Sequence, residues 1–548
     1  MRAIGSAFLL SLAALSWSKM TMTTNLTEGQ AIAGTFQFEV RVQSDALVTN
    51  VEFYVGNDLR STDSSTPYNF LLDTLEEKQG EIKVTFGAYN ADGESVKKTF
   101  TLKVDNGFDK GVDFHVDRAN DFMTNSKFDD AIQACRVALK IDGKNNKARM
   151  AMARANFGKG QFDVAQKFAE DVSADDPSNT DAFALLSAIS LRQAFNTTGS
   201  DSLTTISGAL KSAAEAQFKV LEARSDGFGA ANDSNYTRYA DVMLRAHRYS
   251  RAISELAPRY AKDQTDNEVA NRLMYAYIRS GRMTEAAKTL SDLERFGELD
   301  SYGFSIKAIL SQYAGNTAAS EEAEKEALLY DPTDVTIKFA QSYLALNRGK
   351  LDVLDSFLQG LSTKMPNDPR VNYYLSTQNY LLRNYEESKR RFELTLLTDP
   401  SMYDMLVERG HEIIEATISS GITGTEANAR YELARAYFDA ALGARPESFE
   451  ALAGVSMTYN MLGKHEDARR FGQAAADSAP GYAGGQLALA SAWRALGNSQ
   501  SARVAADAAA KADARLAGRP LPNANDVWMY LWGIGRIPVI PAPGEYSN

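Results

Sequence analysis

The sequence predicts a multidomain chain, with an N-terminal all-β sandwich followed by an all-α solenoid of antiparallel helix pairs. Two observations carry this prediction. Between about residue 34 and residue 104, apolar residues alternate with polar ones, which is the pattern of strands with one buried face. Beyond Gly107 the alternation ends, and small residues recur at intervals of 34 along helical segments that stop near a proline.

Composition limits the classes of function. At 548 residues the chain exceeds the usual size of one hydrophobic core, so several domains or a repeat array are expected. The formal net charge of −11 argues against a dedicated nucleic-acid binder, which normally presents a basic face. There is no local basic run that would favour adhesion to anionic lipid. The single cysteine, Cys135, excludes an intrachain disulfide.

Residues 1–18, MRAIGSAFLLSLAALSWS, have the features of a secretory signal peptide. Arg2 precedes an apolar run from Ala7 to Leu15, and small residues before Lys19 suit cleavage. A buried first helix is the alternative, but the polar, strand-like residues that follow offer it no packing surface. The run is too short to span a membrane. We therefore expect the protein to be exported to the periplasm, the cell surface or the medium.

Residues 19–106 are expected to form the sandwich. The segments TFQFEVRVQ, NVEFYV, EIKVTFGAY and KTFTLKV alternate in polarity, and turn signals such as Asp92-Gly93 separate them. About seven short strands in about 80 residues indicate a β-sandwich. The stretches VEFYVGNDLRSTDSSTPYNFLLDT and GEIKVTFGAYNADGES resemble bacterial immunoglobulin-like domains, although the cysteine pair and core tryptophan of antibody domains are absent. The resemblance implies a spacer or adhesive module, with glycan binding as one option, and identifies no binding residue.

The helical region keeps a 34-residue register. Its unbroken part runs through Ala252, Ala286, Ser320, Leu354 and Ser388, and the same spacing relates Ala131 to Ala165 and Ala434 to Ala468 and Ala502. Prolines end helices about 12 residues after many of these positions. An array with this period resembles tetratricopeptide repeats, in which two antiparallel helices cross at a small residue. The resemblance implies a superhelical solenoid of about eleven repeats over residues 110–516, although Leu354 departs from the pattern by placing a large residue at the small site.

Two insertions and a distinct C-terminal segment interrupt this register. The breaks predict insertions near residues 196–205 and 419–426, at turns between helices. The segment 517–548 holds Trp528 and Trp532 among prolines and glycines. Because a solenoid exposes an apolar end, we expect this segment to cap the final repeat. A docking peptide, for this chain or for a partner, is the alternative.

The sequence contains no recognisable catalytic or metal-binding pattern. The histidines His115, His247, His411 and His465 fall in different repeats, without the spacing of metal ligands. Cys135 falls at a core position of a second helix, where packing is expected rather than nucleophilic chemistry. Gly533-Ile534-Gly535 lacks the third glycine of a phosphate-binding loop. We therefore expect no enzymatic activity, no cofactor and no metal site.

The first helices of tetratricopeptide repeats line a concave groove, and the resemblance places eight candidate partner-binding residues there. They are Asn271, Tyr275, Tyr302, Phe339, Tyr343, Tyr373, Thr377 and Tyr380. Tyrosine offers a large contact area and a hydroxyl at low entropic cost, which suits peptide recognition. About half of this set is expected to pack between neighbouring helices instead. Some members of the family bind a free C-terminal carboxylate with a set of lysine, asparagine and arginine residues. Of that set only Asn271 and Arg370 are present, so recognition of a chain terminus is not expected.

Together these features favour a non-enzymatic, exported scaffold that binds a protein or peptide partner in the concave groove, without nucleic acid and without a membrane span. Two alternatives stay open. One is a cell-surface adhesin, or a glycan- or cell-wall-associated protein, that uses the immunoglobulin-like domain. The other is an intracellular repeat scaffold that retains Met1.

Overall fold

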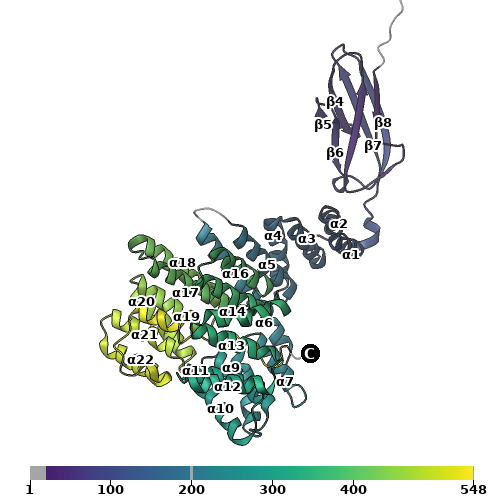
Figure 1. Cartoon of the computed structure of the whole chain (residues 1–548). Helices are drawn as coiled ribbons and strands as arrows, with labels where there is room; N and C mark the ends of the chain where they lie inside the picture. Colours follow the sequence, from purple (N-terminus) through teal and green to yellow (C-terminus); the bar gives the residue numbers. More distant parts are fainter. Residues whose placement is uncertain (1–19, 198–201, 547–548) are drawn as a thin grey trace, which may run out of the picture. The chain divides into compact units, whose positions relative to one another are not determined.

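The computed structural model describes residues 20–197 and 202–546, so the predicted signal peptide at 1–18 lies outside the described residues. The chain divides into two compact units, Met1–Val172 and Ser173–Asn548. Figure 1 shows strands in the purple N-terminal part and helices in the rest of the chain. The predicted succession of an all-β domain and an all-α solenoid is confirmed.

The sandwich consists of two sheets. In the described residues its strands are β1 (Thr21–Thr24), β2 (Ala31–Ile32), β3 (Thr35–Gln43), β4 (Val48–Val55), β5 (Asp58–Asp63), β6 (Tyr68–Asp73), β7 (Gly80–Asn90) and β8 (Ser95–Val104). One sheet has the order β1-β3-β6 and the other β2-β8-β7-β4-β5. All neighbours are antiparallel except β2 and β8. The two-residue strand β2 is too short to show alternation in the sequence, so it was not among the strands expected.

Three phenylalanines form the centre of the sandwich. Phe38, Phe53 and Phe86 come from β3, β4 and β7, and none of them is exposed to solvent. Their ring centroids lie 5.1 to 5.6 Å apart. Aromatic pairs at this separation stabilise a core by about 0.5–1.5 kcal/mol beyond the burial of their area. These rings therefore fill the centre of the sandwich, where antibody domains have a disulfide and a tryptophan.

The helices follow one another as antiparallel pairs. Within the described residues there are eleven: α1 (Gly111–Thr124) with α2 (Phe128–Ile141), α3 (Asn146–Lys159) with α4 (Phe162–Asp175), α5 (Thr180–Asn196) with α6 (Ser202–Gly227), α7 (Tyr236–Arg245) with α8 (Tyr249–Tyr260), α9 (Asn267–Arg279) with α10 (Met283–Phe296), α11 (Ser301–Tyr313) with α12 (Thr317–Tyr330), α13 (Val335–Asn347) with α14 (Leu351–Lys364), α15 (Pro369–Leu381) with α16 (Tyr385–Thr398), α17 (Tyr403–Ser419) with α18 (Gly424–Ala444), α19 (Phe449–Met461) with α20 (His465–Ser478), and α21 (Ala483–Ala495) with α22 (Ser499–Ala512). A shorter helix, α23 (Ala524–Trp532), follows them, and 3-10 turns lie at Thr74–Glu76, Phe108–Lys110 and Ala514–Leu516.

The 34-residue register has two structural causes. Small residues such as Ser388 lie at the crossing of a pair, where the Ser376 hydroxyl donates a hydrogen bond of 2.9 Å to the Ser388 carbonyl. The described turns inside the pairs also have one residue in the left-handed region, and Gly281, Gly315 and Gly349 occupy it with φ of 71°, 81° and 68°.

The two predicted insertions lengthen helices. Residues 419–426 span the end of α17 and the start of α18, and these helices are 17 and 21 residues long, compared with 13 and 14 in the pair α15–α16. The pair at the other break, α5 and α6, is similarly long at 17 and 26 residues. The extra residues continue the helical pattern, so they extend two hairpins instead of forming long surface loops. The four residues 198–201 between α5 and α6 lie outside the described part.

The Ser173–Asn548 unit closes on itself. Helix α6 packs along α18, where a Cβ on Gly443 would lie 3.2 Å from the carbonyl oxygen of Lys211. The turn at Gly281 meets α20–α21, because a Cβ added there would lie 2.8 Å from that of Ala479. The first helices α9, α11, α13, α15 and α17 therefore line an enclosed channel, called the channel below, instead of an open groove.

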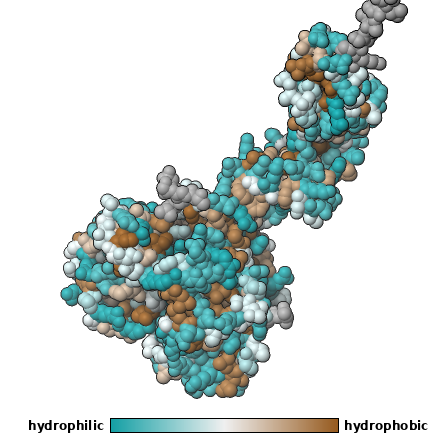
Figure 2. All heavy atoms as spheres, turned by 45° about the horizontal axis from the view of Figure 1, so that its top comes forward, coloured by the Kyte–Doolittle hydropathy of each residue, from teal (hydrophilic) through white to brown (hydrophobic). Residues whose placement is uncertain are grey.

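The surface shows ordinary polarity. Figure 2 shows hydrophilic residues over most of the face in view, with apolar residues in separate patches. Among residues 20–197 and 202–546, none of the helices combines the length and the apolar character of a membrane span.

Candidate functional site

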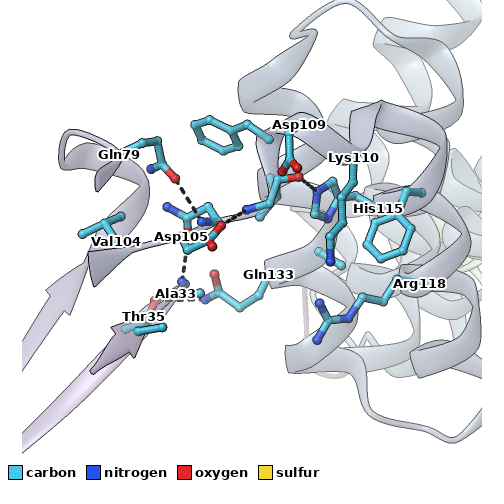
Figure 3. Close-up of a pocket in the computed structure, with 18 of the residues that line it drawn as sticks. Ala33, Thr35, Gln79, Val104, Asp105, Asp109, Lys110, His115, Arg118 and Gln133 are labelled. Carbon is cyan, nitrogen blue, oxygen red and sulfur yellow. Dashed lines mark hydrogen bonds between the residues drawn. The ribbon is translucent and has the colours of Figure 1, made fainter. Parts of the chain in front are cut away.

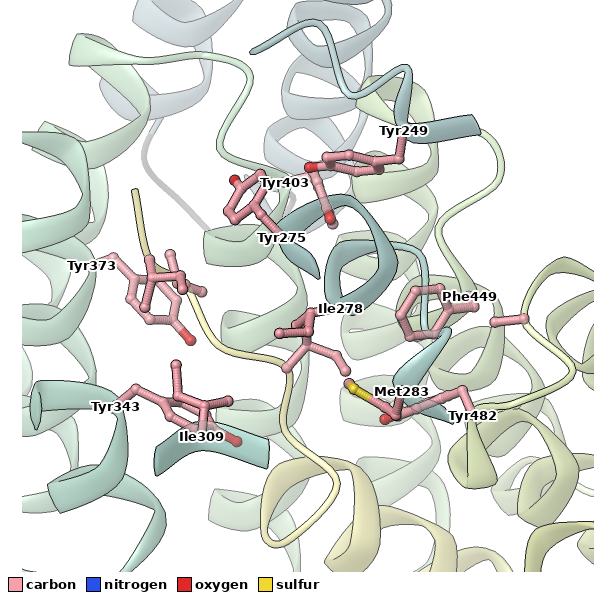
Figure 4. Packing of buried hydrophobic residues seen from close by; sticks show 14 of the residues in the cluster. Tyr249, Tyr275, Ile278, Met283, Ile309, Tyr343, Tyr373, Tyr403, Phe449 and Tyr482 are labelled. Carbon is pink, nitrogen blue, oxygen red and sulfur yellow. The ribbon is translucent and has the colours of Figure 1, made fainter. Parts of the chain in front are cut away.

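The channel is occupied by the C-terminal end of the chain. Helix α23 packs against α19 and α21, which caps the last repeats, and residues 533–546, called the tail below, then run into the channel. The tail is buried without a break from Gly535 to Pro543. In Figure 4 its yellow ribbon passes among the buried side chains of the channel, including Tyr343, Tyr373 and Ile278. Both interpretations of the C-terminal segment thus apply, with α23 as the cap and the tail as a segment docked to its own chain.

Tyrosine hydroxyls bind the main chain of the tail. Tyr302 donates to the carbonyl of Pro541 at 3.0 Å, Tyr343 to that of Arg536 at 2.9 Å and Tyr374 to that of Val539 at 3.0 Å. All three tyrosines are buried on first helices of successive repeats. Because every residue has a carbonyl, these bonds recognise an extended backbone and are indifferent to the side chains of the segment.

Further donors bind carbonyls before this row and within it. The Tyr482 hydroxyl donates to the Gly535 carbonyl at 2.9 Å, the Arg279 guanidinium to the Pro538 carbonyl at 3.1 Å and the Asn347 amide to the Gly533 carbonyl at 3.3 Å. The tail also contains Pro538, Pro541 and Pro543, which have no N–H group. The channel supplies hydrogen-bond donors and the tail supplies acceptors, so the two surfaces are complementary.

Two ion pairs hold the ends of the buried stretch. Arg536 of the tail binds Glu408 of α17 at 2.9 Å, and the indole N–H of Trp532 donates to the same carboxylate oxygen at 2.8 Å. Near the other end, Arg370 of α15 binds both oxygens of Glu545, at 3.0 and 2.9 Å. Buried charges are tolerated only when they are paired. These pairs therefore set the register of the tail along the channel.

The eight sequence-predicted residues all lie on first helices, but only some of them reach the C-terminal segment. Tyr302 and Tyr343 bind the tail as described, and the ring of Phe339 stacks on that of Tyr546 with centroids 6.0 Å apart. Tyr380 meets the ring of Trp532 at 6.3 Å, at the end of α23.

The other members of the predicted set serve the packing of the helices. Asn271 donates to Asp300 at 2.8 Å, Tyr373 to Glu408 at 3.3 Å and Thr377 to the carbonyl of Tyr373 at 3.2 Å. Tyr275 is buried with its ring 6.3 Å from that of Tyr249.

Sequence reasoning missed the donors Tyr482 and Asn347, and it missed three further groups that matter here. Tyr374 is the neighbour of a residue in the predicted set and points to the tail in its place. Arg279 binds Asp404 at 2.9 Å, a partner 125 positions away, and Glu408 binds Arg536 across 128 positions. Acidic and basic side chains are usually exposed, so nothing local in the sequence indicates these buried partners.

A cluster of charges joins opposite sides of the closed ring. The Tyr403 hydroxyl lies 2.6 Å from Arg279 and 2.7 Å from Arg445. Burial, and then the nearby Arg445, lower the pKa of His247 to about 3, so this histidine is neutral at physiological pH. The fixed cations and a neutral histidine constitute a structural cluster and do not form an acid–base pair.

The polar residues around Glu408 enclose little free space. The cavity lined by Tyr373, Asp404, Glu408, His411 and Arg536 has a volume of about 30 Å³. This volume is sufficient for a water molecule but too small for a substrate. Among the described residues, no group of three or more histidine, cysteine, aspartate or glutamate side chains is arranged to hold a metal ion.

A larger hollow of about 790 Å³ lies within the Met1–Val172 unit, between the end of the sandwich and helices α1 and α2. Figure 3 shows His115, Lys110 and Arg118 on its helical side and Thr35, Gln79 and Val104 on its strand side. The polar groups here fasten the two parts together, as in the bond of 2.8 Å between His115 Nε2 and the carbonyl of Gly107. The hollow is therefore a junction between modules.

Comparison with known proteins supports the modules inferred from the residues. A family model of the bacterial Ig domain matches residues 21–86, and two family models of the tetratricopeptide repeat match residues 122–189 and 426–483. Over 177 residues the chain is 25% identical to the TPR repeat-containing protein YpiA of Bacillus subtilis (strain 168). That match covers 32% of this chain and 42% of the relative, so the chain spans less than half the length of the relative.

Two solved structures match the chain at 12% identity. The APC/C hetero-tetramer Cut9–Hcn1 has a TM-score of 0.38, with 77% of this chain and 84% of that chain covered. Yeast Tom70 has a TM-score of 0.30, with 72% and 96% covered. On the family matches and the paired helices, the chain carries tetratricopeptide repeats behind an N-terminal bacterial immunoglobulin domain.

Proposed function

We propose that this protein is an exported, non-enzymatic scaffold that binds an extended segment of a partner protein in the channel of its solenoid. Tetratricopeptide solenoids are generally protein-interaction scaffolds, which sets the broad class. One observation supports the finer proposal. A row of buried donors holds the main-chain carbonyls of an extended segment, here the tail of the chain itself.

The channel has the two properties that peptide recognition needs. Its donors are fixed by helices, so little side-chain freedom is lost on binding. Its walls also carry buried apolar and aromatic side chains, including Ile278, Ile309 and Phe339, which provide contact area without charge. Main-chain recognition combined with apolar walls fits a segment of a protein better than it fits a small metabolite.

The proposal is tested by affinity capture of the full-length chain, followed by crosslinking and mass spectrometry. We expect crosslinks from one partner segment to residues at the channel. Because the tail uses the same hydroxyls, the comparison is made in a chain whose tail is weakened by Arg536→Ala/Glu545→Ala, and there the added double variant Tyr343→Phe/Tyr374→Phe should lose the partner. Two buried carbonyls left without their donors, at about 2 kcal/mol each, correspond to roughly 1,000-fold weaker binding. The matched control is Tyr330→Phe, because Tyr330 is 62% exposed on α12. Undiminished recovery of every partner by the double variant would remove the channel from the proposal.

Export is a separate part of the proposal. It is supported by the signal-like pattern of residues 1–18 and by the Ig domain that follows them. N-terminal sequencing of the native protein is the direct measurement. A mature chain that begins at or near Lys19 is expected, whereas an intact Met1 would contradict export by this route.

A further inference from the structure

The tail and a partner segment cannot share the channel. Tyr302, Tyr343, Tyr374 and Tyr482 each have one hydroxyl proton, and each proton is used in a bond to a tail carbonyl. Gly535 to Pro543 are also buried, and the hollow of about 240 Å³ that remains between the tail and Tyr275, Arg279 and Arg370 is too small for a second extended segment. If the proposed function holds, a partner segment must therefore displace the tail before it can bind in the channel.

The tail can withdraw from the channel without unfolding the helices around it. Residues 533–546 lie outside the helices, and side chains of the channel hold their carbonyls. Gly544 is exposed, and Glu545 and Tyr546 are half-buried, so the tail emerges from the channel at this end. Withdrawal therefore requires no helix to unwind.

The walls of the channel hold together without the tail. Helix α6 meets α18 directly, and the ring of Phe195 on α5 lies 6.1 Å from that of Phe392 on α16. The turn at Gly281 contacts the rings and methyls of Phe449 and Ala479. Because these contacts involve repeats only, an emptied channel keeps its donors in place.

The two ends of the channel define the chemistry of a competitor. Glu408 at one end takes a cation, here Arg536, and Arg370 at the other end takes a carboxylate, here Glu545. Between them the chain reads Ile-Pro-Val-Ile-Pro-Ala-Pro-Gly, which is apolar and interrupted by prolines. A partner segment that satisfies both ends must carry a cation and a carboxylate at the same separation, with few main-chain donors between them.

We propose that the tail is an exchangeable internal ligand. A partner segment enters the channel by displacing it, and this segment carries an arginine, a proline-interrupted apolar run and then a carboxylate. The inference rests on the proposed function, because it assumes that the channel accepts segments from other molecules. Since a tethered ligand competes at an effective concentration in the millimolar range, the tail should strongly weaken binding by any free segment.

The experiment uses the full-length chain and a fluorescently labelled synthetic peptide with the sequence of residues 533–546. Fluorescence anisotropy measures its binding to the wild type and to Arg536→Ala/Glu545→Ala, which weakens the tail and leaves Glu408 and Arg370 of the channel intact. We expect the double variant to bind the peptide at least tenfold more tightly than the wild type. The matched control is Lys288→Ala/Asp292→Ala, which removes an ion pair of 2.6 Å on the outer side of α10 and should behave like the wild type.

A second measurement does not depend on the folding of a variant. Saturating isotope-labelled peptide without the fluorophore should raise hydrogen exchange in the tail of the wild-type chain. Mass spectrometry distinguishes the tail from the peptide by that isotope label. Equal affinity of the wild type and the double variant, or a tail whose exchange is unchanged by bound peptide, would overturn the exchange proposal and leave the proposed function standing. Failure of the peptide to bind any form of the chain would overturn both.

Discussion

Removal of the Tyr374 hydroxyl tests whether the row of donors holds the tail. In Tyr374→Phe the bond of 3.0 Å to the Val539 carbonyl is lost, while the ring, which is 1% exposed, continues to fill its site. A net hydrogen bond is worth about 1 kcal/mol, and a buried carbonyl left without that donor adds a desolvation cost of similar size. The tail should therefore be destabilised by about 2 kcal/mol, which is roughly a 30-fold rise in its opening equilibrium.

Hydrogen–deuterium exchange measured by mass spectrometry reports this opening directly. In the variant, the peptide that covers residues 533–546 should exchange roughly 30-fold faster, while helices α9 to α16 keep their protection. Tyr330→Phe is the control, because it removes a hydroxyl from an exposed ring. Addition of Tyr302→Phe should increase the effect further, since Tyr302 binds a different carbonyl, that of Pro541. Unchanged exchange of the tail in Tyr374→Phe would refute the view that these hydroxyls retain it.

Three other predictions concern packing, protonation and thiol access. Gly454→Ala should lower the stability of the solenoid by about 1–3 kcal/mol in a thermal melt, because the added Cβ would lie 2.6 Å from the Phe438 ring. Gly360→Ala is the control, because its Cβ would meet nothing within 4 Å, and it should raise the stability slightly. Burial raises the pKa of Glu412 from 4.5 to about 7, so between these pH values the folded chain binds a proton that the unfolded chain has released. The free energy of unfolding should therefore fall as the pH rises from 4.5 to 7. Glu412→Gln should flatten this pH dependence in denaturation curves measured across the same range. Burial raises the pKa of the Cys135 thiol to about 12, so a maleimide should label it at pH 8 only after denaturation, and rapid labelling of the native protein would contradict its placement in the core.

The repeats could be predicted because their causes are local. A small residue at most crossings and a left-handed residue in the described turns inside pairs recur at a fixed interval, and this interval is visible in a linear sequence. His247 and Arg383 hold the turn position with φ of 57° and 62°, in place of the glycines at Gly281, Gly315 and Gly349. The 34-residue register persists at these two turns, because a short helical hairpin requires the left-handed conformation and residues other than glycine can adopt it.

The closure of the solenoid and the course of the tail could not be predicted, because they depend on pairs of residues far apart in the chain. Arg279 meets Asp404, and Glu408 meets Arg536, only after several repeats have curved round. The same curvature decides which face of a first helix lines the channel. Position rules taken from open tetratricopeptide grooves selected Tyr373, but in the closed ring its neighbour Tyr374 reaches the tail.

The tyrosines of the channel and the prolines of the tail have complementary hydrogen-bonding requirements. Closure of the ring removes the hydroxyls of Tyr302, Tyr343, Tyr374 and Tyr482 from water, and buried hydroxyls need acceptors. An extended main chain is a dense, uncharged source of acceptors, but most residues also bring an N–H that would need an acceptor in return. Prolines in the tail remove that demand where the channel offers mainly donors. The same reasoning constrains any segment that takes the place of the tail, because a strand with a full set of N–H groups would leave several of them unpaired inside the ring, at about 1–3 kcal/mol each.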